Sequence, residues 1–386
     1  MKMRFKDVKS GFGLIGVNAA ATLVFIFLLN ALSNVVLLIY KMAEYRAIIN
    51  QERDMAALPN YEDNSEFSEI HFQEFAHLPV QYEPFIGWSR LPFQGRTITV
   101  DVEGNRLHPN TQTSPKGLPS KAVHFFGGST MWGTGASDYE TIPAFFNEDT
   151  GIPSFNLGET GFNARQSLAQ LIQLLTVSDK DINSVVFYDG VNEVLSLCRS
   201  EHDVGEHIRA HRMREVLNDQ VNAIPLSEFQ YYLDFMFLRG SRSLVFGIAQ
   251  AQSDKQPWNC DTQPQKARQV AKSLLRTWEL AHSITEKEGI RFLAVLQPVA
   301  FLGNPKLDHI SHLQDDDNPL GKQFRAVYPL IQELIRERQY DWIVDYTNLF
   351  SMDEYIYVDF CHVAANGNKI VAQQVSKDLD IVWRAN

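Results

Sequence analysis

Hydrophobic and polar residues are distributed differently in two parts of the chain. An apolar segment lies near the N-terminus, and a longer region of short apolar runs and amphipathic stretches follows it. The apolar segment, Gly11 to Tyr40, contains no Asp, Glu, Lys, Arg or His. At about 1.5 Å rise per residue, a helix over it would extend about 45 Å, more than the roughly 30 Å hydrocarbon core of a bilayer. The pattern therefore predicts one transmembrane helix over residues 11–40.

The charged residues that flank this segment set its expected orientation. Basic residues are more numerous before the segment than directly after it: Lys2, Arg4, Lys6 and Lys9 precede it, and Lys41 and Arg46 follow it. The positive-inside rule then places residues 1–10, a basic tail, in the cytoplasm. The rest of the chain would lie outside the cytoplasmic membrane, in an extracytoplasmic or periplasmic space.

A cleaved signal peptide is the alternative interpretation of the apolar segment. Its apolar region would normally span about 7–15 residues and end at a small-residue cleavage site. The segment here is longer, and its small-residue sequence Ala31-Leu32-Ser33 lies well inside it. These features favour an uncleaved single-pass anchor, against which the polar Asn18, Asn30 and Asn34 count.

The region after the anchor changes character twice. Residues 41–81 are rich in charge and show no strong period, so we expect a helical continuation followed by a tether. From Tyr82 to Arg106 aromatic residues, glycine and short alternating runs predict a hairpin. This hairpin would lead into one folded domain over residues 82–386.

Within that domain, short apolar runs alternate with amphipathic helical patterns. The runs are Ala122–Phe126, Ser154–Leu157, Ser184–Tyr188, Phe292–Leu296 and Trp342–Asp345. The helical patterns include Ser167–Leu175, Ala267–Glu288 and Ala364–Leu379. Buried strands that alternate with covering helices specify an α/β fold, with a parallel sheet between two helix layers. Chemistry in such a sheet belongs at the carboxyl ends of the strands.

One connection is too long for an ordinary strand-to-helix loop. Residues from about 194 to 265 separate the third run from the next helix and contain helical patterns over 206–220 and 226–238. We expect an insertion that lies over the active face and shapes the choice of substrate.

Composition and charge narrow the classes of protein and partner. A chain that is 45% hydrophobic and 21% charged is a folded protein rather than a disordered one. The net charge of −11 and the lack of a Lys/Arg run argue against nucleic acid as a partner. Cys198 and Cys260 bracket the insertion, so either these two form a disulfide and Cys361 stays free, or all three are buried thiols.

Candidate chemical groups follow each of the first three predicted strands. Gly127-Gly128-Ser129 follows the first, where a tight turn would expose a hydroxyl. Gly158 ends the second and offers a backbone N–H. Gly190-Val191-Asn192 follows the third, and an Asn side chain there is able to donate to a developing negative charge. Each of these motifs alone is more often a simple turn.

The last candidate precedes the final helix. In Asp359-Phe360-Cys361-His362 a carboxylate lies three residues before an imidazole. A hydroxyl becomes a good nucleophile only when a base takes its proton, and an acid must orient that base. Ser, Gly and Asn follow the first three strands in turn, and Asp-x-x-His precedes the last helix. Chance is a less credible explanation for this whole arrangement than for any one of the motifs.

In this order the chain resembles the SGNH hydrolases, the GDSL-type esterases and lipases. The resemblance runs from about Tyr82 to the C-terminus, and the lead-in is similar to a membrane-anchored bacterial branch of that family. It implies a flavodoxin-like, three-layer α/β/α domain that hydrolyses ester-linked acyl groups, acetyl among them, without a metal or other cofactor. Matching residues would be a Ser129, His362 and Asp359 triad, with an oxyanion hole from the Ser129 and Gly158 amides and the Asn192 side chain.

Two residues depart from the family pattern. Gly128 stands where an Asp usually precedes the nucleophile, and Glu193 stands where Asp is commoner after Gly-x-Asn. Because neither belongs to the triad, these changes bear on substrate preference more than on catalysis. The substrate would be an ester-bearing small molecule, lipid or glycan.

Three other functions compete with ester hydrolysis. An acyltransferase would pass the acyl group to an envelope glycan, and a catalytically silent domain would only bind it. His207 and His211, spaced by four with His202 close by, suggest a metal site, but the Glu of zinc proteases is missing after the first His. We expect a solvated helix face there and no metal.

Overall fold

The computed structural model describes residues 5–109, 122–177, 182–210, 213–214, 228–253 and 258–385. The chain forms two compact units. The smaller contains Met1–Asn50 and Arg212–Gln256, and the larger contains Gln51–His211 and Pro257–Asn386. The larger unit holds the central sheet and the predicted catalytic residues.

The central sheet has five strands in the order β6-β5-β7-β8-β9, and every neighbouring pair is parallel. The strands are β5 (Val123–Gly127), β6 (Ser154–Gly158), β7 (Ser184–Asp189), β8 (Arg291–Leu296) and β9 (Ile343–Asp345). Each coincides with one of the predicted apolar runs. This is the flavodoxin-like order, whose topological switch point lies between β5 and β7. The predicted fold class is confirmed.

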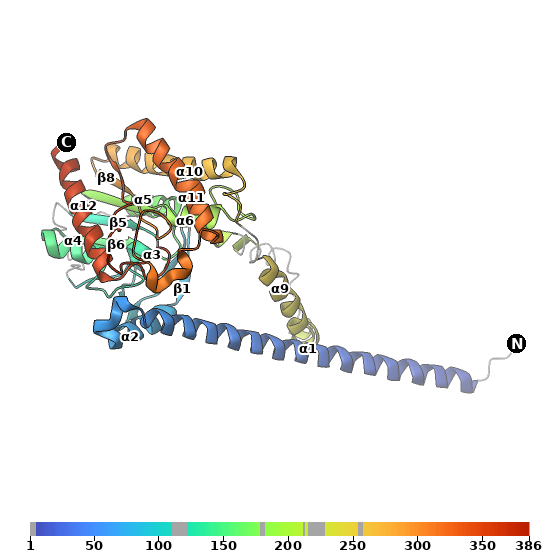
Figure 1. The fold of residues 1–386 in the computed structure, drawn as a ribbon. Helices are drawn as coiled ribbons and strands as arrows, with labels where there is room; N and C mark the ends of the chain where they lie inside the picture. The colour runs from blue at the N-terminus through green and yellow to red at the C-terminus, as the bar shows by residue number, and fades with distance from the viewer. Residues whose placement is uncertain are drawn as a thin grey trace. The chain divides into compact units, whose positions relative to one another are not determined.

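Two layers of helices cover the sheet (Figure 1). Helices α4 (Ile142–Thr150) and α12 (Ala365–Ala385) pack against each other on one face. On the other face, α10 (Pro264–Lys287) packs against both α5 (Ala164–Val177) and α11 (Pro319–Arg338). Because both faces are covered, the central strands β5 and β7 are buried at every position rather than at alternate ones.

The predicted tether is wrong for the residues nearest the domain. The 3-10 helix η1 (Pro59–Asn64) and α2 (Ser65–Ala76) fold onto the larger unit. Tyr61 and Phe72 are buried in a small apolar cluster, and the Tyr61 hydroxyl donates to the Gly135 carbonyl at 2.7 Å. The sequence of this region is rich in charged residues, and its few buried apolar residues contact residues that are distant in sequence. A local pattern therefore does not predict these contacts.

The predicted hairpin consists of two short antiparallel ribbons. Strand β1 (Val80–Glu83) pairs with β2 (Gly87–Arg90), and β3 (Phe93–Gln94) pairs with β4 (Thr99–Val100). The bounds of the hairpin prediction, Tyr82 to Arg106, therefore cover most of both ribbons.

The described residues of the smaller unit are mainly helical. Helix α1 (Phe5–Ala56) contains a segment that is long and apolar enough to cross a membrane, judged by length and composition. The insertion contributes α8 (Glu228–Phe237) and α9 (Arg239–Ser253) to the same unit. Helix α8 matches the pattern predicted over 226–238, whereas most of the 206–220 pattern lies outside the described residues.

Candidate active site

Ser129 lies at the carboxyl end of β5, where it begins the short helix α3 (Ser129–Trp132). The turn before it requires glycine, because Gly127 has a φ of +154° and a Cβ there would lie 2.5 Å from the Tyr188 carbonyl oxygen. The turn ends β5 abruptly and leaves Ser129 partly exposed. Ser129 thus lies at the carboxyl edge of the sheet, as the sequence predicts, and this edge is at the switch point between β5 and β7.

His362 connects Ser129 to Asp359. The Nε2 atom of His362 lies 2.7 Å from Ser129 Oγ, and its Nδ1 atom lies 2.6 Å from Asp359 Oδ2. The Asp359 carboxylate also accepts the backbone N–H groups of Cys361 and His362 at 2.8 and 2.7 Å. With Nδ1–H donated to the carboxylate, Nε2 is left to accept the serine proton.

The ionisation of these groups follows from their surroundings. Burial pushes the pKa of Asp359 up, but the neighbouring His362 and the hydrogen bonds to the carboxylate outweigh it and hold this pKa below its usual value. Burial raises the pKa of the Cys361 thiol well above its usual value. Asp359 is therefore ionised near neutral pH and Cys361 stays a thiol.

Asp359, Cys361 and His362 are also close enough together to be considered as metal ligands. Their chemistry fits a metal poorly, because a metal takes the thiolate rather than the thiol. The nitrogen and oxygen that face each other are already joined by a hydrogen bond. The arrangement suits proton transfer better than coordination.

Asn192 reaches the same place from the carboxyl end of β7. It is the second residue of α6 (Val191–Leu197), and its Nδ2 donates to the Phe162 carbonyl at 2.7 Å. A Cβ on Gly128 would lie 2.2 Å from this Nδ2 and 3.1 Å from the Phe162 oxygen. The Asn192 amide therefore occupies the space that a side chain at position 128 would need, so glycine fits there without displacing Asn192.

The prediction for Gly158 needs correction. Its backbone N–H donates to Asn156 Oδ1 at 3.0 Å, and a Cβ on it would lie 2.6 Å from the Trp132 nitrogen. Gly158 thus packs closely against α3, and its N–H is already paired with Asn156 rather than free to bind a ligand. Gly161, which was not among the predicted site residues, lies next to Phe162 in the loop that Asn192 contacts.

Gly161 differs from Gly158 in both conformation and environment. It has a φ of +81°, which favours glycine, and it is partly exposed. Within the described part of the chain, we find no hydrogen bond from its N–H. The repeated glycine in Gly158-Glu159-Thr160-Gly161 is a signal that could have identified it.

Glu193 has a structural role that explains the second departure. Its carboxylate accepts the Ala164 N–H at 2.6 Å and the Gly190 N–H at 2.9 Å, so it joins the start of α5 to the turn after β7. Burial raises the pKa of Glu193. Burial and the nearby Glu193 carboxyl together raise the pKa of Asp189 well above its usual value. The two backbone hydrogen bonds to Glu193 hold the turn that leads to Asn192.

Trp132, at the end of α3, packs against two buried arginines. The guanidinium carbons of Arg106 and Arg90 lie 4.3 and 5.4 Å from its ring centroid. Each arginine forms a buried ion pair at 3.0 Å, Arg106 with Asp138 and Arg90 with Glu159. The region before β5 therefore fixes the helix that begins with Ser129.

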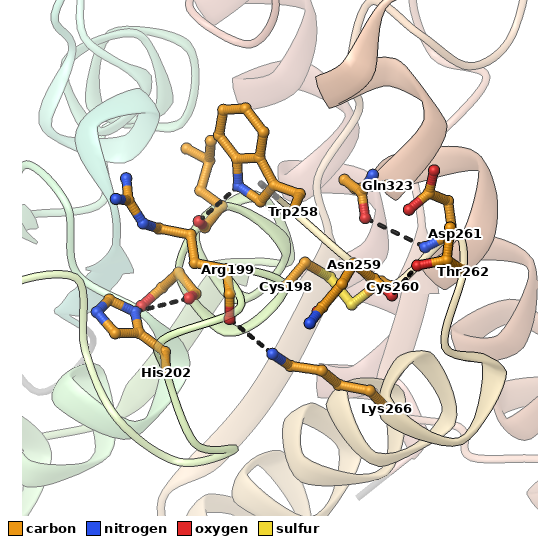
Figure 2. Close-up of a disulfide and its surroundings, with 12 residues drawn as sticks. Cys198, Arg199, His202, Trp258, Asn259, Cys260, Asp261, Thr262, Lys266 and Gln323 are labelled. Atoms are coloured by element: carbon orange, nitrogen blue, oxygen red, sulfur yellow. Dashed lines mark hydrogen bonds between the residues drawn. A yellow bond between two sulfur atoms is a disulfide. The ribbon is translucent and has the colours of Figure 1, made fainter. Parts of the chain in front are cut away.

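A disulfide joins Cys198 and Cys260 at the two ends of the insertion (Figure 2). Around it, Lys266 Nζ donates to the Arg199 carbonyl at 2.6 Å and Trp258 Nε1 donates to the Leu195 carbonyl at 3.2 Å. Cys361 is free and buried. The structure thus adopts the first of the two cysteine arrangements.

The histidines of the suggested metal site do not form one in the described residues. His202 is buried with Nδ1 2.8 Å from the Ser196 carbonyl, and His207 packs edge-on against Trp88 with centroids 5.4 Å apart. His211 lies outside the described residues. His202 is buried and His207 is half-buried at the start of a turn, so this described pair does not form the expected solvated helix face.

No family model and no curated protein matches the chain. Solved structures similar to it include a lipolytic G-D-S-L family protein from Veillonella parvula, with 12% identity, 66% of this chain and 96% of that chain covered, and a TM-score of 0.37. A lipase/acylhydrolase from Enterococcus faecalis has 12% identity, coverages of 68% and 96%, and a TM-score of 0.37. An acetylxylan esterase from Geobacillus stearothermophilus has 13% identity, coverages of 67% and 93%, and a TM-score of 0.33.

Proposed function

We propose that the protein is a serine esterase that hydrolyses ester-linked acyl groups. The observation that carries the proposal is the chain of two short hydrogen bonds from Ser129 through His362 to Asp359. This arrangement activates a hydroxyl as a nucleophile and holds the imidazole in the required tautomer. It lies at the carboxyl edge of a parallel sheet, where such folds bind ligands.

In the proposed first step, Ser129 Oγ attacks the ester carbonyl carbon while its proton passes to His362 Nε2. The tetrahedral intermediate then expels the alcohol, which takes the proton from His362. In the second step water replaces the serine hydroxyl and releases the acid. Asp359 stabilises the imidazolium that forms in each step and keeps its own charge.

The oxyanion would be stabilised by donors from the three neighbouring strand ends. The Ser129 N–H is one of the unpaired donors at the start of a helix. The Asn192 amide has a second hydrogen besides the one it gives Phe162. We assign the third donor to the Gly161 N–H in place of Gly158, because the Asn192 contact brings this loop beside the turn that carries Ser129.

We also propose that α1 anchors the protein in the cytoplasmic membrane, with its N-terminus in the cytoplasm and the catalytic unit outside. The support is the apolar length of α1, the basic residues before it and the Cys198–Cys260 disulfide. Disulfides persist in oxidising compartments outside the cytoplasm.

A fluorophosphonate probe and a chain-length series of nitrophenyl esters test the activity. The parent protein should react with the probe and hydrolyse at least one ester, and Ser129→Ala should lose both properties. Ser283→Ala, which changes an exposed serine on α10, is the matched control and should keep both. Acetylated glycans assayed in parallel would identify an acetyl substrate. Retention of labelling and turnover by Ser129→Ala would refute the proposal.

A further inference from the structure

The apolar segment of α1 contains an asparagine whose side chain is almost completely buried. Asn30 is 3% exposed, while most of the described side chains around it on α1 are exposed. Its Nδ2 donates to the carbonyls of Phe235 and Met236 at 3.1 and 2.9 Å. Its Oδ1 accepts the N–H groups of Gly240 and Ser241 at 2.7 and 3.2 Å. One side chain therefore satisfies four backbone groups.

Those four backbone groups lie where α8 ends and α9 begins. A break between two helices leaves the last carbonyls of one and the first N–H groups of the other without intrahelical partners. In water such groups bind solvent, whereas in lipid each unsatisfied group costs several kcal/mol. Asn30 supplies the partners that lipid would not.

The contact between α9 and α1 is close. A Cβ on Gly240 would lie 2.5 Å from Asn34 Nδ2 and 2.7 Å from the Asn30 carbonyl oxygen. Beside it, Ser33 Oγ donates to Ser241 Oγ at 3.3 Å. Small residues and interhelical hydrogen bonds of this kind are how helices associate within a bilayer.

Helices α8 and α9 expose many large hydrophobic side chains, alongside the polar Gln230, Arg239, Arg242 and Ser243. Their exposed hydrophobic side chains are Tyr231, Tyr232, Leu233, Phe235, Met236, Leu238, Val245 and Ile248. A patch of this kind marks an interaction site rather than an ordinary soluble surface.

The described charged side chains of the two helices have partners within the pair. Arg242 forms an ion pair with Asp234 at 3.0 Å, and Arg239 donates to the Tyr231 hydroxyl at 3.2 Å with its guanidinium over the Tyr231 ring. Charged side chains tolerated at membrane depth are paired or reach toward the interface.

We propose that α8 and α9 form a hairpin that enters the outer leaflet of the membrane and packs on α1, with lipid acyl chains covering its outer face. Asn30 lies ten residues before Tyr40, the end of the apolar segment, so the hairpin tip lies about 15 Å inside that end. The inference rests on the proposed anchoring by α1. It gives Asn30 and Asn34, which count against an anchor in the sequence, a role within the bilayer.

Nitroxide labels on the full-length protein in phospholipid vesicles test this placement. Cys361→Ala removes the free thiol, and single cysteines replace Leu238 and Ile248 on the hairpin, Leu32 on α1, and Leu280, an exposed residue of α10. We expect the labels at 238, 248 and 32 to collide with oxygen at least severalfold more than with a water-soluble nickel chelate. The label at 280 should show the reverse.

Each result decides one of the two proposals. If the label at 32 is in lipid but those at 238 and 248 meet the nickel chelate, the anchor holds and the hairpin inference is wrong. If the labels at 238 and 248 meet neither reagent, protein covers the face and the lipid proposal is wrong. If the label at 32 also meets the chelate, the anchoring itself fails.

A cross-link tests the contribution of Asn30 separately. The pair Ser33→Cys and Ser241→Cys should form a disulfide in vesicles, because the two hydroxyls are in contact. Adding Asn30→Leu should lower the cross-linking rate about tenfold, since it removes four interhelical hydrogen bonds. The matched change Asn18→Leu, at an exposed position on the same helix, should leave the rate unchanged. Equal rates for both variants would contradict the role of Asn30.

Discussion

Gly128 and Asn192 are packed so closely that a Cβ on residue 128 would lie 2.2 Å from Asn192 Nδ2. We expect Gly128→Ala to displace the Asn192 amide, because a side-chain amide moves more easily than the nearby Phe162 carbonyl. Loss of one oxyanion donor typically lowers kcat about 100- to 1000-fold. Steady-state kinetics on the best nitrophenyl ester should show this fall in kcat with little change in KM.

Gly151→Ala is the control for a general effect of removing a glycine. Gly151 has a φ of +67° with open space around its Cα, so its replacement strains the backbone without touching the site. It should lower stability modestly and leave kcat unchanged. A Gly128→Ala enzyme with parental kcat would show that Asn192 does not act as a donor.

Asp359 is predicted to act through the tautomer of His362. In Asp359→Asn the amide is able to donate to Nδ1, which would place the imidazole proton on Nε2 and prevent it from accepting the serine proton. The expected loss is on the order of 10⁴-fold in kcat. Asp353→Asn, an exposed carboxylate paired with Lys306, is the control and should keep activity. A loss below tenfold for Asp359→Asn would contradict the proposed role.

The sequence predicts the sheet and its reactive edge because both depend on local patterns. A parallel strand buried on both faces is a short apolar run, and the residue after it must lie at the carboxyl edge. This pattern therefore predicts that Ser129 and Asn192 lie at that edge, whereas His362 was expected there from its spacing to Asp359. Gly158 was a wrong choice of donor, because the strand continues through it and Asn156 uses its N–H.

Other features depend on contacts that no local pattern reveals. Residues 59–76 look like a charged spacer, yet Tyr61 and Phe72 are buried against the larger unit. The α8–α9 break is joined to α1 across 205 to 211 positions of sequence through the side chain of Asn30. In both cases one or two side chains determine where a segment packs. The hydrophobic periodicity of the segment does not reveal which side chains these are.

Arg106 is predicted to stabilise the fold near α3. Its guanidinium donates to Asp138 Oδ1 at 3.0 Å and to the carbonyls of Gly133 and Ala136, both at 2.6 Å. Arg106→Met would leave the Asp138 charge buried without its partner, which typically costs about 3–5 kcal/mol. Urea unfolding of the purified protein in detergent measures this cost.

The matched control for Arg106→Met is Arg96→Met. Arg96 forms an ion pair with Glu66 in which both side chains are largely exposed, and such pairs contribute at most about 1 kcal/mol. Similar losses for the two variants would indicate that the buried pair contributes no more than the exposed one.

His71 should make stability depend on pH. It is buried, with Nε2 2.8 Å from the Thr134 carbonyl, and burial, with a smaller effect of Arg106, lowers its pKa from 6.5 to about 3. Between pH 6.5 and about pH 3 the unfolded chain binds a proton at His71 that the folded chain does not. The free energy of unfolding therefore falls as the pH falls through this range. From pH 7 to pH 5 the loss is about 2 kcal/mol. The free energy of unfolding of the parent should fall by that much more than that of His71→Gln, and parallel pH profiles would contradict the assignment.

The Cys198–Cys260 disulfide closes a long loop, with a sequence separation of 62. In the chain-entropy model such a bond stabilises the folded protein by about 4 kcal/mol, because it restricts the unfolded chain. We therefore expect a phosphine reductant to lower the free energy of unfolding of the parent by about that amount.

The double variant Cys198→Ala, Cys260→Ala should already be destabilised and insensitive to the reductant. Cys361→Ala should respond to the reductant as the parent does, because Cys361 is a free thiol. A parent protein that unfolds at the same urea concentration with and without reductant, after mass spectrometry has shown the bond reduced, would mean that the ends of the insertion are held together by the surrounding hydrogen bonds alone.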